Sequence, residues 1–471
     1  MGDAAVLPAR VRERLRWFSL TPFDQSTPEG RAQERHRRVA LTAAASALAK
    51  VLSVGTALIS IPLTLHYLGV ERFGMWMTIS SLIAMLAFAD FGIANGVLSA
   101  VAQAHGRDDR ADSQRIVSSG FFMLTAIAAG LLALFAVAYA QVPWHAVFNV
   151  QGELARAEAG PALAVFVSCF AAAIPLTVVQ RVQMGLQQGF LASLWQCVGS
   201  LCALAGVLLA IHLQGGLHWL VLAFAGAPLL AALLNSLYFY LRSRPDLRPR
   251  FKFFTPSTAR QLVRTGALFF VLQLTVAVAY TSDGIVIAQL LGASAVAEYA
   301  VPEKLFGLIS VCVAMVLAPL WPAYGEAIAR GDHAWVRRTL KRSLLMAVGI
   351  AAVASLCLVL LAPTLLHWWV SDALAAPFLL LLALAVWKVI EAGGNALAVY
   401  LNGAHVIGLQ VATSVSVAVS ALLLKLLLIP MFGIAGAVWA TVAAYLVFAA
   451  MPYAFFLPRL VASSNRPAVR P

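Results

Sequence analysis

Charged side chains inside long apolar segments are the residues of this sequence best able to do chemistry. Lys50 and Asp90 each stand near the middle of such a segment, and Lys388 and Glu391 stand three residues apart in another. A charge at the centre of a bilayer costs about 2.5–3.5 kcal/mol on insertion scales, so it usually faces a cavity or a partner. Lys388 and Glu391 share a helix face, where they either neutralise each other as an ion pair or line a cavity.

Other charges of the same kind occur in the sequence: Arg181, Arg264, Asp283, Glu303, Lys304 and Lys425. Cationic side chains in a cavity suit an anionic substrate, such as a phosphate-bearing lipid or an acidic glycan. Carboxylates suit a coupling proton or sodium ion, and the candidates for that role are Asp90, Asp283, Glu303 and Glu391.

Some of these charges also have a purely structural interpretation. Arg181, Arg264 and Lys425 stand near the ends of apolar segments, where we expect long basic side chains to reach the lipid interface. Asp90 either pairs with Lys50 or organises the short segment AFADFGIANG around itself. Lys50 has no acid three or four residues away, so we expect it to line a cavity.

The composition identifies the elements that must position these residues. Hydrophobic residues form 61% of the 471 residues and charged residues only 11%, whereas soluble domains carry about 25% charged residues. An all-α integral membrane protein is therefore predicted. The formal net charge of +13 is assigned to cytoplasmic loops rather than to nucleic-acid binding.

About twelve segments reach the roughly 20 apolar residues that a membrane helix needs. They lie near 39–67, 75–103, 117–141, 160–184, 189–212, 217–241, 264–291, 297–323, 342–366, 376–399, 406–428 and 432–457. With twelve spans, 27 of the 33 basic residues fall on the side of the N-terminus, and only Arg72 and Arg156 fall in loops on the other side. This asymmetry predicts that both termini are cytoplasmic.

The longest polar break divides the chain into two halves of six spans. We predict a basic N-terminal segment (1–38), a first lobe (39–241), a linker (242–263), a second lobe (264–457) and a tail (458–471). At a constant offset of 223, LGVERFGMW at 68–76 corresponds to LGASAVAEY at 291–299, which indicates an internal repeat. Val11, Leu15 and Phe18 give the N-terminal segment an apolar stripe that either lies on lipid or belongs to a solvated tail.

No cofactor or metal site is expected. The nine histidines show no HExxH spacing, and no GxxxxGK[ST] loop indicates direct use of ATP. The cysteines all lie in apolar segments and are interpreted as buried small side chains: Cys169, Cys197, Cys202, Cys312 and Cys357.

The stretch from Ile61 to Phe122 resembles polysaccharide flippases of the Wzx type. These belong to the multidrug/oligosaccharidyl-lipid/polysaccharide exporter (MOP) superfamily, whose fold is MATE-like. The shared traits are P-L-T-x-x-x-L-G (62–69), ERFGMW (71–76) and D-x-G-I-x-N-G (90–96). The second half is similar in DGIVIAQLLG (283–292) and in the Y-x-x-x-x-K-L run at 299–305.

The resemblance implies two six-helix bundles around a central cavity that opens alternately to either side. The implied cargo is an undecaprenyl-pyrophosphate-linked oligosaccharide, an O-antigen or exopolysaccharide repeat unit, moved between the leaflets of the bacterial inner membrane. Cationic cavity residues of the family correspond here to Lys50, Lys304 and Arg264, and Lys388 is a further candidate. The implied partners are the lipid-linked glycan, membrane lipids and glycan-assembly proteins.

Two other functions are compatible with this sequence. A MATE-type multidrug or cation antiporter would share the same fold. A membrane-embedded glycan polymerase or ligase would need a sizeable outer loop with catalytic residues, but the longest outer loop here, about 142–159, is short. We therefore predict a transporter and not an enzyme.

Overall fold

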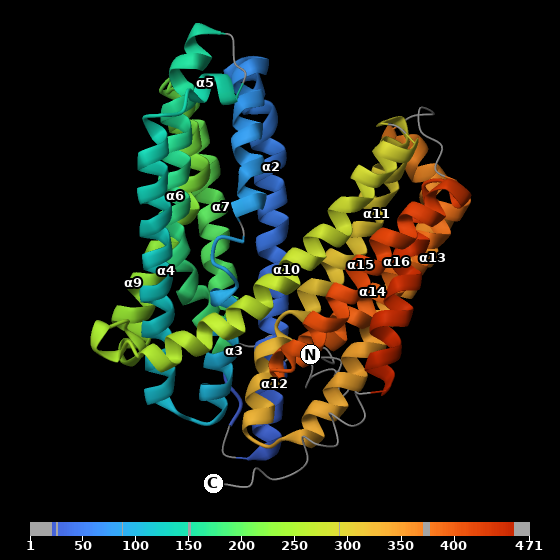
Figure 1. Cartoon of the computed structure of the whole chain (residues 1–471). Coiled ribbons are helices and arrows are strands. Elements are labelled where there is room, and N and C mark those ends of the chain that lie inside the picture. Colours follow the sequence, from blue (N-terminus) through green and yellow to red (C-terminus); the bar gives the residue numbers. More distant parts are fainter. Residues whose placement is uncertain are drawn as a thin grey trace, which may run out of the picture. The chain divides into compact units, whose positions relative to one another are not determined.

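The computed structural model describes residues 21–24, 27–86, 88–148, 152–291, 293–370 and 377–455, and these form helices and connecting turns without any strand (Figure 1). The predicted apolar stripe at residues 11–18 and the tail 458–471 lie outside the described residues. The chain forms two compact units, Met1–Ala267 and Leu268–Pro471. The division falls within one helix, a few residues after the expected linker.

In the described part of the first unit, the long helix α2 comes first. Its helices and short helical turns are α2 (Pro28–Leu86), α3 (Ile93–Gly106), α4 (Arg110–Tyr139), α5 (Trp144–Val147), α6 (Glu153–Gly185), α7 (Gly189–His212), α8 (Leu217–Val221), η1 (Leu222–Gly226), α9 (Ala227–Tyr238), η2 (Phe239–Ser243), η3 (Pro245–Leu247) and η4 (Phe251–Phe253). The segments η1 and η2 are π-helical turns at the two ends of α9, and η3 and η4 are 3₁₀ turns.

Within the described residues, the second unit contains five long helices and two short ones. These are α10 (Pro256–Leu291), whose first residues belong to the first unit, α11 (Ala293–Leu317), α12 (Leu320–Ala329), α13 (His333–Val370), α14 (Phe378–Gly403), α15 (Ile407–Phe432) and α16 (Ala435–Tyr445). A π-helical turn, η6 (Leu446–Ala450), extends α16.

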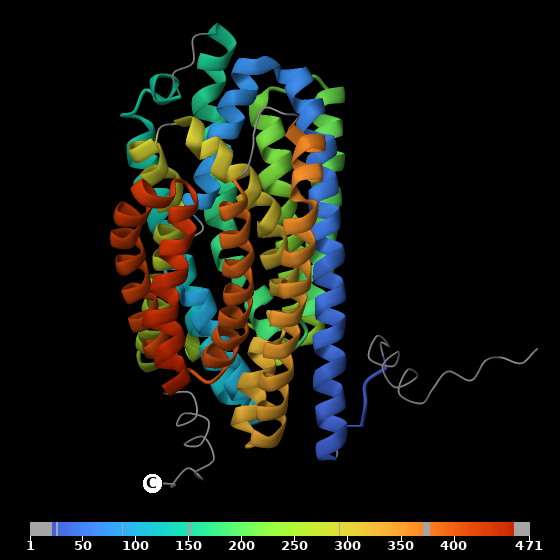
Figure 2. The ribbon, with the colours of Figure 1, turned by 90° about the vertical axis from the view of Figure 1, so that its right-hand side faces the viewer.

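Helix α2 contains the first expected span, 39–67, and the beginning of the second, 75–103. Its 59 residues would extend about 89 Å if straight, whereas the hydrocarbon core of a bilayer is about 30 Å thick. The chain turns back at Gly69, whose φ of 72° and ψ of 170° are not helical. Glycine adopts a positive φ without steric cost, so it permits this turn. The fold of the chain at the top of α2 is visible in Figure 2.

The second expected span, 75–103, is not one continuous helix. Residues 88–92 form a turn between α2 and α3, with positive φ at Phe91 (48°) and Gly92 (72°). Asp90 lies in this turn, and its Oδ1 accepts a hydrogen bond from the Gly92 N–H at 2.9 Å. In the structure, Asp90 therefore stabilises the turn in its own segment, which is one of its two expected roles.

The expected linker is attached to α4. The N–H groups of Arg250 and Thr255 donate to the hydroxyls of Ser118 and Ser119, each at 3.3 Å. In the same stretch, hydrogen bonds from Arg244 hold the pKa of the Asp246 carboxyl below its ordinary value. These contacts fix the path by which the chain leaves the helices of the first unit.

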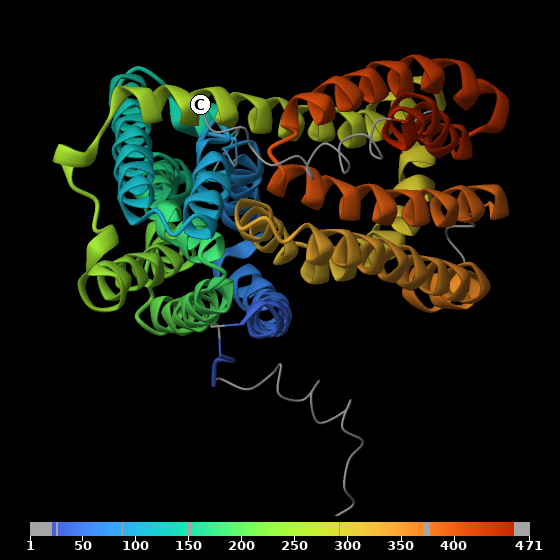
Figure 3. The same ribbon diagram turned by 90° about the horizontal axis from the view of Figure 1, so that it is seen from below.

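In the second unit α14 is the central helix. It packs against α11, α12, α13, α15 and α16, and Figure 3 shows it between α13 and the α15–α16 pair. The helices α15 and α16 approach closely at Gly436, where a Cβ atom would overlap the backbone of Leu428.

Ten helical segments among the described residues are long and apolar enough to cross a membrane. The two other expected spans, 75–103 and 264–291, coincide with α2–α3 and with α10. The prediction of an all-helical membrane protein is confirmed.

Candidate functional site

Lys388 and Glu391 form an ion pair on α14, as their spacing suggests. The ammonium Nζ lies 2.8 Å from Glu391 Oε2. Ser310 of α11 completes a triangle, because its hydroxyl accepts from Lys388 Nζ and donates to Glu391 Oε2, each at 3.0 Å. Lys388 is only 5% exposed. A buried ammonium needs such partners, because an unpaired charge in a low-dielectric interior carries a large desolvation cost.

A second ion pair joins α15 to α10. Lys425 Nζ lies 2.5 Å from Asp283 Oδ1, and Tyr299 of α11 donates its hydroxyl hydrogen to Asp283 Oδ2 at 2.7 Å. The side chain of Lys425 is completely buried. The expectation that Lys425 reaches the lipid interface is therefore wrong, because its ammonium group is directed to a carboxylate inside the unit.

A small cavity is lined by one member of each ion pair, Asp283 and Lys388. Its volume is about 20 Å³, and α10, α11, α14 and α16 all contribute to its wall. A cavity of this size holds about one water molecule or an ion of similar size. The lining residues are Asp283, Tyr299, Glu303, Leu384, Trp387, Lys388, Val438 and Thr441.

The side chains around this cavity carry more negative than positive charge. We call Asp283, Glu303, Lys388, Glu391 and Lys425 the charge cluster. Asp283 and Glu391 each have a lysine partner, whereas Glu303 has no ion pair within the described part of the chain. The cluster thus contains three carboxyl groups and two ammonium groups. One proton or one monovalent cation would balance it.

The structure brings four of the sequence-predicted site residues into the charge cluster: Lys388, Asp283, Glu303 and Glu391. Sequence reasoning did not assign Lys425, Tyr299, Ser310 or Thr441 to a site. A signal for Lys425 was present, because it is the only charged residue of the span 406–428. A lone lysine in a span usually faces a cavity or an acidic partner on another helix.

The other predicted cations lie elsewhere. Lys50 on α2, Arg264 on α10 and Lys304 on α11 have exposed side chains. In the described residues none of the three takes part in an ion pair, so Lys50 is not paired with Asp90. Asp90 instead interacts electrostatically with Arg181, which is half-buried on α6.

Polar contacts in the first unit hold helices together. Arg72 donates two hydrogen bonds to Glu158, at 2.7 and 2.8 Å, and Glu158 Oε1 also accepts from the Leu217 N–H at 3.0 Å. Deeper in the unit, the side-chain amides of Gln183 and Asn235 exchange hydrogen bonds of 2.8 and 3.0 Å. Arg72 and Glu158, both placed in outer loops by the sequence, thus fix α2 to α6 and α8.

The fold is similar to that of solved MATE structures. A mutant MATE protein superimposes with a TM-score of 0.78 at 15% sequence identity, covering 91% of this chain and 97% of that chain. A multidrug resistance MATE family transporter of the MOP superfamily, in its outward-facing conformation, superimposes with a TM-score of 0.76 at 15% identity. This match covers 92% of this chain and 97% of that chain. A MOP superfamily transporter from Pyrococcus furiosus, described by the reverse polarity of its binding pocket, superimposes with a TM-score of 0.77 at 14% identity. Its match also covers 92% of this chain and 97% of that chain.

The sequence itself matches one family model, described as polysaccharide biosynthesis protein, over residues 42–328. No curated protein sequence matches the chain. The match covers more than half of the chain, and the fold is that of the MATE structures. The chain belongs to the polysaccharide biosynthesis protein family and is a multi-pass membrane protein with a MATE-like fold.

Proposed function

We propose that the protein moves an undecaprenyl-pyrophosphate-linked oligosaccharide from the inner to the outer leaflet of the bacterial inner membrane, by ion-coupled alternating access. The observation that carries this proposal is the family match over residues 42–328. A polysaccharide is assembled from units built on a lipid carrier, and a protein of that family with a transporter fold suits the step that carries such a unit across the bilayer.

The unpaired cations suit the anionic part of such a substrate. Lys50, Lys304 and Arg264 have exposed side chains, and no carboxylate among the described residues neutralises them. An unpaired ammonium or guanidinium group is available to a diphosphate or an acidic sugar, with which it forms strong charge-assisted hydrogen bonds. Lys388 was a candidate for the same role, but its charge is already engaged by Glu391. We therefore assign Lys388 to coupling.

The charge cluster suits the coupling ion. Glu303 supplies the surplus negative charge beside a cavity of about 20 Å³, which has room for a proton-carrying water or a small cation. Its occupancy would change the charge at the junction of α10, α11, α14 and α16. Ion coupling requires that the ion binds the inward-open and outward-open states with different affinities. An ion in this cavity meets that requirement if the helices that line the cavity separate in one of the two states.

The proposal is tested by translocation in proteoliposomes. The substrate is a polyprenyl-diphosphate-linked oligosaccharide, and a glycosidase added outside reports the arrival of sugar at the outer surface. We expect Lys50→Ala to lower substrate affinity about tenfold to hundredfold, since a hydrogen bond to a charged group contributes about 1.5–3 kcal/mol. Lys50→Arg keeps the charge and is the matched control. Wild-type protein that leaves the glycolipid in place would contradict the proposal, and Lys50→Ala with unchanged affinity would remove that residue from the site.

A second candidate is a multidrug or cation antiporter, favoured by the fold of the MATE structures. The same vesicles distinguish the two. Export of a cationic dye against its gradient, without glycolipid movement, would establish the antiporter and overturn the flippase.

A further inference from the structure

A groove of about 1150 Å³ runs along the second unit between α13, α14 and the α16–η6 segment. We call it the α13–α16 groove. Its α13 wall includes His333, Arg337, Lys341, Leu344 and Val348, which recur at helical spacing on one face. From His333 to Val348 the helix rises about 22 Å, which exceeds half of the roughly 30 Å hydrocarbon core. The groove is thus long enough to hold an extended lipid chain.

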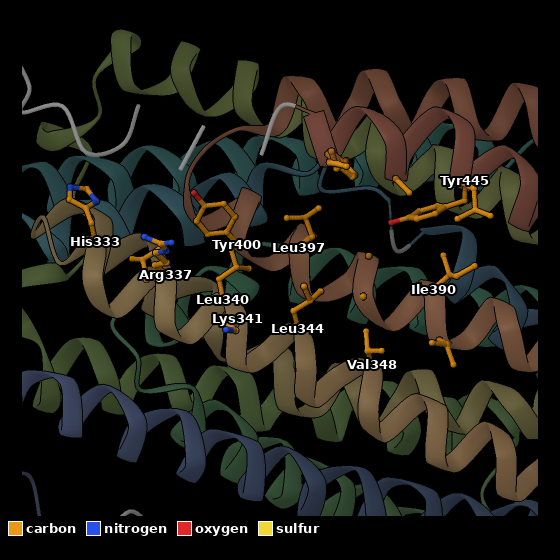
Figure 4. Close-up of a pocket in the computed structure, with 18 of the residues that line it drawn as sticks. His333, Arg337, Leu340, Lys341, Leu344, Val348, Ile390, Leu397, Tyr400 and Tyr445 are labelled. Carbon is orange, nitrogen blue, oxygen red and sulfur yellow. The ribbon is translucent and has the colours of Figure 1, made fainter. Parts of the chain in front are cut away.

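The chemistry of the groove changes along its length. Figure 4 shows His333, Arg337 and Lys341 together at one end, near Tyr400. Toward the other end the labelled lining is apolar, with Leu344, Leu397, Val348 and Ile390, until Tyr445 is reached. A site with a cationic mouth and an apolar interior fits an amphiphile with an anionic head and a long hydrocarbon chain.

The cationic mouth has charge available for a ligand. Arg337 and Lys341 have exposed side chains, and within the described residues neither takes part in an ion pair. The positive-inside rule predicts that this end of α13 is cytoplasmic. The head of a lipid in the inner leaflet would therefore meet the groove at its basic end.

Two glycines of α14, Gly393 and Gly394, line the groove where it meets Tyr445 and Val348. A Cβ atom at Gly394 would overlap the hydroxyl of Tyr445, and a Cβ atom at Gly393 would lie 3.4 Å from Val348 Cγ2. The opposite wall includes Leu446 and Ala450 of the π-helical turn η6. Irregular turns of this kind inside helices are frequent at functional sites.

We infer that the α13–α16 groove binds the lipid carrier of the substrate, with its polyprenyl chain along the apolar length and its diphosphate at Arg337 and Lys341. That the lipid is this carrier rests on the proposed function. That the ligand is an amphiphile with an anionic head follows from the lining of the groove. Two basic side chains and an imidazole suit a diphosphate, which carries more negative charge than the single phosphate of an ordinary phospholipid. The second unit would thus bind the polyprenyl chain and the diphosphate of the carrier, and the glycan would bind outside this groove.

The experiment measures binding of a photoreactive polyprenyl diphosphate without sugar to the full-length protein in phosphatidylcholine nanodiscs. The test variant is the double substitution Arg337→Gln/Lys341→Gln. The matched control is Arg338→Gln/Arg342→Gln, which removes the same charge from the same helix at residues that do not line the groove. We expect binding about tenfold weaker in the test variant, through loss of charge-assisted hydrogen bonds, and unchanged binding in the control.

A second pair of variants tests the apolar length. Gly393→Phe places a ring in the groove and should abolish crosslinking, whereas Gly349→Phe, at a position with open space around its Cβ, should retain it. Phosphatidylglycerol and inorganic diphosphate serve as competitors. Neither should displace the probe, because one lacks the second phosphate and the other lacks the chain.

The inference is overturned if the Arg337/Lys341 variant binds like wild type, or if both double variants weaken equally. It is also overturned if phosphatidylglycerol competes as well as the polyprenyl diphosphate, because the groove is then an ordinary phospholipid site. Failure of the proposed function is a separate result, namely wild-type protein that binds the probe in the groove but moves no glycolipid in the vesicle assay.

Discussion

Lys425 and Asp283 show how much one buried side chain depends on another. The ammonium group is completely enclosed and lies 2.5 Å from the carboxylate. A buried ion pair contributes little net stability compared with an apolar pair, but removal of one partner leaves an uncompensated charge. The pair is therefore better suited to fix the relative positions of α10 and α15 than to add stability.

We predict that Lys425→Met destabilises the protein by about 3–5 kcal/mol, because Asp283 loses its counter-charge. The double variant Asp283→Asn/Lys425→Met should recover most of that loss, since the amide oxygen still accepts from Tyr299. Unfolding titrations in mild detergent measure both. Lys304→Met, at an exposed and unpaired position, is the control and should change stability by no more than about 0.5 kcal/mol. A double variant as unstable as the single one would show that the pair is not the cause.

At the scale of elements, close helix contacts depend on glycine. Helices α15 and α16 are joined by a short turn in which Gly433 has a positive φ of 59°. Three residues later, Gly436 lies directly against the backbone of Leu428. Backbone cannot move aside as a flexible side chain can, so this contact requires the absence of a Cβ atom.

Gly436→Ala should therefore destabilise the protein by about 1–3 kcal/mol through overpacking. Gly349→Ala is the matched control on α13, because no atom lies within 4 Å of its Cβ position. That control should be neutral, or stabilising by about 0.5–1 kcal/mol, since alanine is the better helix former. Thermal unfolding of the purified proteins measures the difference. Equal behaviour of the two variants would contradict the close contact.

At the scale of the whole molecule, two compact units share the helix α10. The charge cluster lies entirely within the second unit, and its residues come from α10, α11, α14 and α15. A change of charge there acts on helices of one unit directly. In the proposed cycle, ion binding would bias the transporter between its states through these helices.

We predict that Glu303→Gln uncouples transport from the ion gradient. The neutral amide removes the surplus negative charge, so substrate still exchanges down its own gradient while an imposed proton or sodium gradient no longer accelerates it. Vesicles with and without such a gradient provide the measurement. Glu298→Gln, also on α11 but not lining the cavity, should remain coupled. A Glu303→Gln protein that still responds to the gradient would exclude this residue as the coupling site.

Much of the architecture follows from the sequence alone. The sequence predicts a multi-pass helical protein from the scarcity of charge, the lengths of the apolar segments and the alternation of basic loops. In lipid, each span must form its own backbone hydrogen bonds and contain few charged residues, and both properties depend on the local sequence. The pair Lys388 and Glu391 is also predicted locally, since residues three apart on a helix are neighbours. The motifs at 61–122 likewise led to the family.

The tertiary structure decided which charges meet. Lys425 and Asp283 stand on helices far apart in the sequence, and no local periodicity shows that they face each other. The hydropathy pattern does not reveal the break at Asp90 either, because a turn of five residues hardly changes the mean hydropathy of a span. Hydrophobicity is a sum over each segment, so the sequence determines where the chain enters the membrane. Charge pairing and grooves depend on how helices rotate and pack, so only the folded chain places the charge cluster and the α13–α16 groove.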